Sequence, residues 1–199
     1  MHEAVFAEFA RLTANLPPPR HVLEVGIARD ARSLLELPAV QGALCVGVGL
    51  DPPENLGGAR ILTANAHDLG ALGSESFDLV LCNSMLEHDP EFWRSLSEMR
   101  RLVLPGGHIV LGVPGYGAMG LGLGGLRRRL AALVSGQAVA AFRAASLTLG
   151  LHGYPDDYYR FSTSAMTQVL LAGFEPLKVV QLLSPPRLIG LGRKAESHT

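Results

Sequence analysis

The sequence has few cysteines, and their scarcity argues against two classes of protein. Only Cys45 and Cys82 occur among its 199 residues, and both fall inside apolar, strand-like stretches. They do not have the spacing of metal ligands, so no metal is expected. We interpret them as buried free thiols in a reducing compartment, which argues against a disulfide-stabilised secreted domain.

Net charge and long apolar runs are scarce as well. The chain has 17 Lys and Arg against 18 Asp and Glu, a formal net charge of −1, so its overall charge does not attract nucleic acid. Glu3 and Glu8 interrupt the beginning, where a signal peptide would be apolar, and no apolar run reaches transmembrane length. We expect a cytoplasmic protein with no nucleic-acid partner and no stable membrane insertion.

What the sequence does contain is an alternation of short apolar strands and helical segments. Its apolar content is 48%, and its length suits one domain with a sizeable core. Helices are expected at 3–16, 31–37, 90–103 and 162–172, and strands at 21–25, 43–50, 60–63, 76–82, 108–113 and 174–181, with a candidate seventh at 187–191. This alternation predicts an α/β fold with a doubly wound, mostly parallel sheet.

The first expected strand leads into a turn that carries the clearest ligand signal. Glycine at position 26 allows a tight strand-to-helix turn, which in a parallel sheet lies at the carboxyl edge, where ligands bind. The second strand ends at Asp51, whose carboxylate could accept from the two hydroxyls of a ribose. The alternatives are an ordinary turn that happens to contain Gly26, and a solvated aspartate before proline.

Residues 114–153 interrupt the alternation. Six glycines between 115 and 125 precede Arg127, Arg128 and Arg129 and then a largely apolar helix to about Leu149. We interpret the segment as a helical lid inserted in a single domain that spans 1–199. The apolar part is too short to cross a bilayer, but with the arginines it could lie on a membrane surface or a partner. We favour a helix packed over the mouth of the active site.

Several motifs, taken in order, resemble a class I S-adenosylmethionine-dependent methyltransferase of the small-molecule, methyltransferase type 11-like kind. They are Leu-Glu24-Val-Gly26, Gly-Leu-Asp51, Asn65-Ala66-His67-Asp-Leu69, Phe77-Asp78-Leu-Val, Leu86-Glu87-His88, Leu104-Pro-Gly-Gly107 and Gly173-Phe174. The resemblance implies a Rossmann-like, seven-stranded sheet with helices on both faces. It also implies S-adenosyl-L-methionine as cofactor.

The same resemblance implies roles for particular residues. The methionine part of the cofactor would lie over the turn, and the adenine would lie beyond the third strand. The implied cofactor-binding residues are Glu24, Gly26, Ala28, Asp51, Asn65, Ala66, His67, Asn83 and Ser84. Ala28 and Asp30 stand where the family usually has glycine, and Asn65 stands where it usually has an acid. Arg29 and Arg32 could offset Asp30 by pairing with it or with the carboxylate of the cofactor.

The acceptor side has two candidate groups. His88 follows the fourth strand and is the first candidate for a base that removes a proton from a hydroxyl or amine; His152 is the second. Tyr154, Asp157, Tyr158 and Arg160 would bind the acceptor. The alternatives are a structural histidine that bonds backbone at a helix N-terminus and a packed corner in which Tyr and Arg bond backbone.

The sequence therefore predicts an enzyme that transfers a methyl group to a small-molecule acceptor, at oxygen or nitrogen. The alternative is a catalytically weak cofactor-binding module that acts through a partner at the lid. A nicotinamide dehydrogenase is disfavoured, because Gly26-Ile-Ala28 lacks the spaced glycines of that fingerprint. A homodimer is compatible with either reading.

Overall fold

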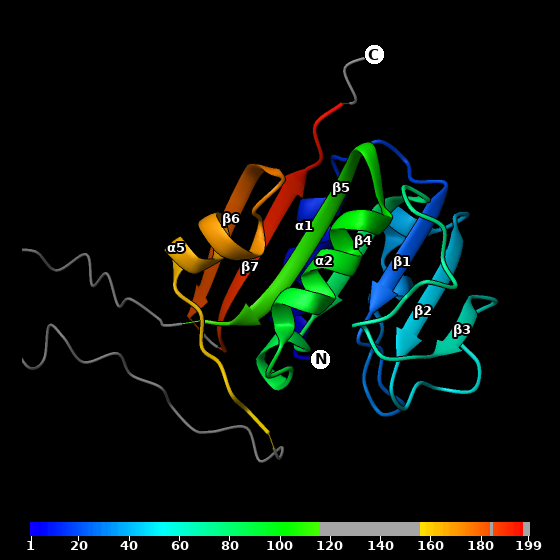
Figure 1. Ribbon diagram of the computed structural model, residues 1–199, viewed down its shortest axis with the longest axis horizontal. Helices are drawn as coiled ribbons and strands as arrows, with labels where there is room; N and C mark the ends of the chain where they lie inside the picture. Colours follow the sequence, from blue (N-terminus) through cyan, green and yellow to red (C-terminus); the bar gives the residue numbers. More distant parts are fainter. Residues whose placement is uncertain (116–155, 184, 197–199) are drawn as a thin grey trace, which may run out of the picture.

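A seven-stranded sheet forms the centre of the computed structural model, which describes residues 1–115, 156–183 and 185–196. The strand order is β3-β2-β1-β4-β5-β7-β6, and only β7 runs against the others (Figure 1). The strands are β1 (His21–Val25), β2 (Leu44–Gly49), β3 (Arg60–Thr63), β4 (Phe77–Asn83), β5 (Val103–Pro114), β6 (Glu175–Leu183) and β7 (Pro186–Arg193). The predicted doubly wound α/β fold is confirmed.

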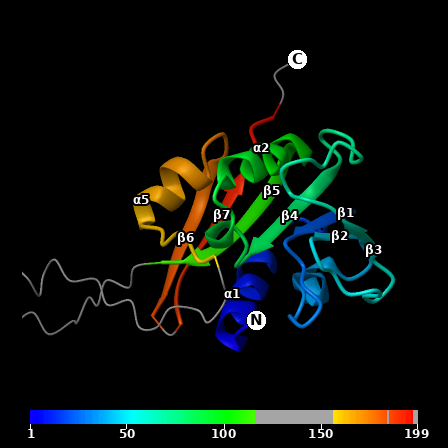
Figure 2. The same ribbon diagram turned by 60° about the horizontal axis from the view of Figure 1, so that its bottom comes forward.

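Helices cover both faces of this sheet, as expected. On one face, α1 (Glu3–Thr13) buries Phe6 and Phe9 against side chains of β4, β5 and β7. On the other face, α2 (Phe92–Leu102) packs with α5 (Thr163–Ala165) and the following π-helical turn η4 (Met166–Leu170). Figures 1 and 2 show α1 and α2 on opposite sides of the sheet. Neighbouring residues of β4 alternate between the two cores, since Leu81 faces α1 and Cys82 faces α2.

The predicted helix at 31–37 is wrong. Two short 3₁₀ turns, η1 (Leu34–Glu36) and η2 (Pro38–Val40), stand in its place. The buried carboxylate of Glu24 accepts from the amides of Leu34 (2.9 Å) and Leu35 (3.2 Å), and Pro38 follows with no amide hydrogen to continue a helix. The bonds to Glu24 therefore cap the start of η1, and Pro38 interrupts the continuation into an α-helix.

Three other predicted boundaries shift. Helix α1 ends at Thr13 rather than 16, where the threonine hydroxyl bonds the carbonyl of Phe9 at 2.8 Å. Helix α2 begins at Phe92 rather than Pro90, because the 3₁₀ turn η3 (Leu86–His88) comes first. Strand β5 begins at Val103 and includes residues 104–107, which were expected to lie outside it, and the register with β4 shifts there.

The lid predicted at about 114–153 lies outside the described residues, apart from Pro114 and Gly115. Its interpretation, and that of a single domain over 1–199, stay predictions. Within the described ranges, no helix is long and apolar enough to cross a membrane.

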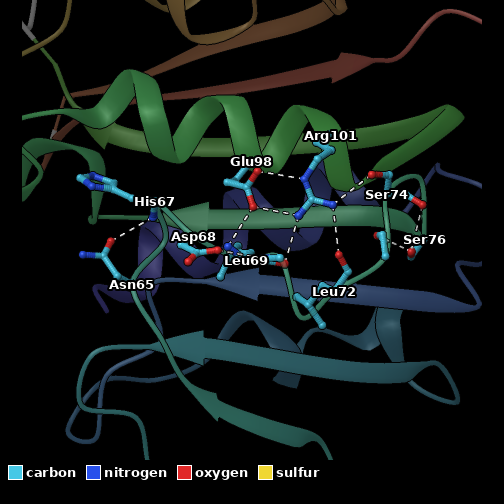
Figure 3. A network of polar contacts seen from close by, with 11 residues as sticks. Asn65, His67, Asp68, Leu69, Leu72, Ser74, Ser76, Glu98 and Arg101 are labelled. Carbon is cyan, nitrogen blue, oxygen red and sulfur yellow. Dashed lines mark hydrogen bonds and ion pairs between the residues drawn. The ribbon is translucent and has the colours of Figure 1, made fainter.

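The connection from β3 to β4 has no helix and is held by α2 instead. Glu98 accepts from the amide of Leu69 at 2.8 Å, and its partner Arg101 donates to the carbonyls of Leu69 and Leu72, both at 3.0 Å, and to Ser74 Oγ at 3.1 Å (Figure 3). The hydrogen bond from Arg101 lowers the pKa of Glu98. We name Glu98 and Arg101 the α2 clamp.

The α2 clamp generates a prediction about local stability. Replacing Arg101 by Gln removes the charged donors of the loop carbonyls, so the Leu69 and Leu72 amides should exchange with solvent about tenfold faster or more, the effect of losing a hydrogen bond to a charged group. Hydrogen exchange read by NMR measures this. Arg100→Gln is the matched control, because Arg100 donates to Val169 instead and should leave the loop unchanged. Equal loop protection in both variants would contradict the clamp.

Burial of Glu24 generates a prediction about pH. Desolvation raises the pKa of this carboxyl from 4.5 to about 6, although hydrogen bonds from Ser33, Leu34 and Leu35 oppose the rise. The folded state therefore binds the proton more tightly, and the stability that this adds is complete below about pH 4.5 and lost as the pH rises through 6. Between these limits it amounts to about 2 kcal/mol.

The amide of Glu24→Gln can still accept a hydrogen bond but does not titrate. From pH 4.5 to 7, the unfolding free energy of the wild type should fall by about 2 kcal/mol relative to this variant, as measured by urea denaturation. Glu36→Gln, in the next turn and half-exposed, serves as control and should follow the wild type. Parallel curves for the wild type and Glu24→Gln would rule out the effect.

Candidate functional site

Contacts within the protein determine the conformation of the turn after β1. Gly26 has φ +92°, and a Cβ there would lie 2.7 Å from Cβ of Met85. The amides of Gly26 and Ile27 both donate to the carbonyl of Val48, at 2.8 and 3.0 Å. The turn thus folds across the end of β2, and Ala28, the next residue, is exposed at the carboxyl edge of the sheet.

Glu24, the first predicted cofactor residue, points beneath this turn rather than out of it. Its carboxylate is 4% exposed and bonds the hydroxyl of Ser33 besides the amides of Leu34 and Leu35. Its hydrogen bonds run to Ser33 and to η1, so Glu24 contributes to the site by fixing the segment that follows the turn at Gly26.

Asp51 follows the end of β2 by two residues at the same edge of the sheet, and its side chain is 76% exposed. Arg29 donates from Nη2 to Oδ1 of Asp51 at 2.9 Å and lies 3.8 Å from Glu54. The arginine on the turn therefore pairs with the acid of β2 rather than with Asp30. Arg32 turns away to Glu3 at 2.7 Å and stacks on the Phe6 ring of α1.

The loop after β3 brings Asn65 and His67 to this edge. Asn65 Oδ1 accepts from the amide of His67 at 2.9 Å, and the His67 Nε2 lies 2.8 Å from Oδ1 of Asp89. Asp89 is buried and also accepts from Ser95 Oγ at 2.6 Å and from the amide of Glu91 at 2.9 Å. Ala66 lies between the two, half-buried.

Asn83 and Ser84 follow β4 on the α1 face of the sheet. Ser84 adopts φ +55°, a conformation that is uncommon outside glycine and is found at functional turns. Asn83 Nδ2 donates to Ser84 Oγ at 3.0 Å, whereas Asn83 Oδ1 is buried without a hydrogen-bond partner among the described residues. A buried carbonyl oxygen without a donor is costly, so a donor from a ligand, such as an amine, would satisfy it.

His88 and the segment that begins at Asp156 meet, as expected. His88 Nδ1 lies 3.2 Å from the carbonyl of Asp156, and the amides of Tyr158 and Tyr159 donate to the carbonyl of Glu87 at 2.8 and 3.3 Å. The bond to the Asp156 carbonyl requires a proton on Nδ1, which in a neutral imidazole makes Nε2 the acceptor. This is the tautomer that a base needs, although the bond to backbone is also the one expected of a structural histidine.

The other acceptor candidates divide between a packed corner and an exposed surface. Arg160 forms a two-point ion pair with Asp157, and both side chains are largely buried, so neither is presented to an acceptor. Tyr158 is half-exposed, and its proximity to Asp156 helps to raise its pKa. His152 and Tyr154 lie outside the described residues.

Two functional contacts were missed by the sequence analysis. The bond between Asp89 and His67 was not foreseen. Glu87 is fully buried and pairs with Arg187 of β7 at 3.1 Å, while its second carboxylate oxygen has no hydrogen-bond partner among the described residues. Partners 22 and 100 positions apart leave no local pattern in a sequence.

The carboxyl edge therefore unites five predicted segments from four neighbouring strands. It offers an exposed acid on β2, acceptors beyond β3, an unpartnered amide oxygen on β4 and a histidine with a defined tautomer. Their chemistry fits a ligand that carries hydroxyls and amines, as an aminoacyl nucleoside does. Arg29 would have to share Asp51 with a ribose or release it.

Comparison with known proteins supports this fit. Residues 33–111 match the model of a methyltransferase domain family. No curated protein sequence matches the chain.

Solved structures match over nearly the whole chain, although their low identities show only the fold. A 1,6-didemethyltoxoflavin-N1-methyltransferase of Burkholderia thailandensis, bound to its substrate and S-adenosylhomocysteine, is 20% identical with a TM-score of 0.65, over 98% of this chain and 80% of its own. The N-methyltransferase NodS of Bradyrhizobium japonicum WM9 with S-adenosylhomocysteine is 13% identical, with a TM-score of 0.63 over 97% and 87%.

The cyclase SpnF also matches, at 13% identity and a TM-score of 0.68, over 98% of this chain and 81% of its own. A fold shared by methyltransferases and a cyclase does not by itself fix an activity. The family match is what restricts the assignment. Residues 33–111 resemble a methyltransferase domain family, and the chain as a whole has the fold of the class I S-adenosylmethionine-dependent methyltransferases.

Proposed function

We propose that the protein transfers the methyl group of S-adenosylmethionine to nitrogen or oxygen of a small-molecule acceptor. The observation that carries this is the convergence of Asp51, the Asn65–His67 loop, Asn83 and His88 on one edge of the sheet. The two similar structures named above are both N-methyltransferases by name, and the first of them was solved with the small molecule 1,6-didemethyltoxoflavin bound. This similarity supports nitrogen of a small molecule as the acceptor.

The cofactor side of the proposal rests on acceptor groups. Asp51 would hold the ribose, and the loop at Asn65–His67 would lie along the adenine. The unpartnered Oδ1 of Asn83 would accept from the amine of the methionine part. When bound, the cofactor supplies an electrophilic methyl group; these residues contribute binding and orientation.

The acceptor side rests on His88. Transfer from a sulfonium is an in-line displacement, so an acceptor hydroxyl or ammonium must lose its proton near the reacting atom. The Asp156 carbonyl fixes the His88 proton on Nδ1, which orients Nε2 for that step. The exposed ring of Tyr158, on the same segment, would form one wall for the acceptor.

Calorimetric titration tests the cofactor class first. S-adenosylhomocysteine should bind, and NAD should not. Binding without transfer to any acceptor would favour the alternative, a cofactor-binding module that acts through a partner at the lid.

Asp51→Ala should weaken S-adenosylhomocysteine by about 1.5–3 kcal/mol, roughly 10-fold to 150-fold in Kd, because a ribose would lose hydrogen bonds to a charged group. Glu54→Ala is the matched control, since Glu54 also lies near Arg29 and is exposed but lies farther along the chain from the end of β2. Its Kd should stay within about twofold of the wild type, in keeping with the small energies of exposed ion pairs. An unchanged Kd in folded Asp51→Ala would remove Asp51 from the site.

His88→Ala should lower turnover by about 10²–10⁴-fold while S-adenosylhomocysteine binds nearly as before, because only proton removal is lost. The measurement is transfer of labelled methyl to an acceptor found by screening small amines and alcohols. His21→Gln, at the opposite edge of the sheet, is the control and should keep wild-type turnover. Comparable turnover in both variants would assign His88 a structural role.

A further inference from the structure

The turn after β1 lies directly on the end of β2, and this contact joins Arg29 to Asp51. The carbonyl oxygen of Ile27 lies 2.1 Å from where a Cβ on Gly49 would stand, an approach that a side chain there would block. The amide of Arg29 donates to the carbonyl of Asp51 at 3.1 Å. Backbone contacts therefore fix the point from which the side chain of Arg29 extends toward Asp51.

The guanidinium of Arg29 lies among three acids and pairs most closely with one of them. Its Nη2 donates to Oδ1 of Asp51 at 2.9 Å, whereas its Nη1 lies 3.8 Å from Glu54, and Asp30 acts on it through charge. The hydrogen bond to Asp51 is the largest of the effects that raise the pKa of Arg29. The arginine thus rests on the carboxylate that we propose for the ribose.

A carboxylate that already pairs with an arginine is a weaker acceptor for a hydroxyl. A ribose diol would use both oxygens of Asp51, and Arg29 occupies one direction of approach to Oδ1. The second lone pair of Oδ1 stays available, so the contact does not close the site. The guanidinium nevertheless offsets the negative charge that makes a hydrogen bond to a carboxylate strong.

The second arginine after the turn does not share this arrangement. Arg32 donates to Glu3 at 2.7 Å and stacks on the ring of Phe6, on the α1 side of the turn. The two arginines therefore lie three positions apart in the chain but have different partners, and Arg32 provides a matched control for Arg29.

We propose that Arg29 is an internal competitor of the ribose, whose ion pair with Asp51 has to loosen when the cofactor binds and thereby lowers its affinity. The inference rests on the proposed function and concerns how the protein regulates that same site. The ion pair re-forms when the ribose leaves, so it also favours release of the spent cofactor.

Binding of 5′-methylthioadenosine tests the competition, because this ligand has the ribose diol and the base but no charged group that could attract Arg29. In calorimetric titrations, Arg29→Gln should bind it about twofold to fivefold more tightly than the wild type, the range for an exposed ion pair. The 2′,3′-dideoxy analogue lacks the diol and should bind both proteins equally.

Two further variants isolate the contact between Arg29 and Asp51. Arg32→Gln removes the same charge close to the turn and should keep the wild-type Kd for methylthioadenosine. In an Asp51→Ala background, Arg29→Gln should have no effect, because the competition needs the carboxylate. Thermal melts verify that each variant is folded.

Salt provides an independent readout on the wild type. Raising sodium chloride from about 0.02 to 0.5 M screens the exposed ion pair but acts little on an uncharged ligand. The ratio of the Kd of the wild type to that of Arg29→Gln should therefore fall toward one as salt rises.

The outcomes separate this inference from the proposed function. If the wild type does not bind S-adenosylhomocysteine, the proposed function fails and the inference falls with it. If it does, and Arg29→Gln binds methylthioadenosine no more tightly than the wild type, or neither binds it detectably, the inference alone is overturned. A gain that persists with the dideoxy analogue or without Asp51 would overturn it as well.

Discussion

The buried carboxylate of Asp89 has to be surrounded by donors, and the elements that supply them are the ones that form the site. Its donors come from the loop after β3, from the backbone that enters α2 and from the second turn of that helix. A buried charge that loses such partners costs several kcal/mol, so these segments are held in a fixed relation to one another. The loop proposed to lie along the adenine and the start of α2, which follows His88, are thus both held by Asp89.

The bonds to Asp89 matter because no α-helix lies between β1 and β4 in the sequence, a stretch that the structure describes throughout. Only 3₁₀ turns connect β1 to β2, and irregular loops connect β2 to β3 and β3 to β4. Close packing and hydrogen bonds from side chains hold these connections in place of helices. Gly47 allows the Ile27 side chain to lie directly on β2, with its Cδ1 only 2.6 Å from where a Cβ would stand, and Glu98 and Arg101 hold the third loop. Loop position therefore depends on a few specific side chains.

This dependence explains where sequence reasoning succeeded. The strands were predictable because each is a continuous apolar run, and α1 and α2 because their apolar residues recur at helical spacing. The prediction for 31–37 failed because the segment forms two 3₁₀ turns in place of an α-helix, and the residue that caps the first of them, Glu24, lies on a strand ten positions earlier, where no local pattern shows it. The edge location of Asp51, Asn65 and His88 followed from topology, whereas Asp89–His67 and Glu87–Arg187 join residues that only the fold brings together.

Residues 156–161, which include the proposed contact to the acceptor at Tyr158, are held in place by contacts that do not involve the side chain of Tyr158. Residues 156–161 are attached mainly through backbone: the amides of Tyr158 and Tyr159 bond the Glu87 carbonyl, and that of Phe161 bonds the Pro114 carbonyl at 3.0 Å. Tyr159 is further fixed by its hydroxyl on the Pro90 carbonyl and by its ring against Phe92, but Tyr158 is half-exposed. Backbone attachment does not depend on the side chain at 158. If this segment lines the acceptor site as proposed, a change at 158 would alter the surface that an acceptor meets while the backbone of the segment keeps its place.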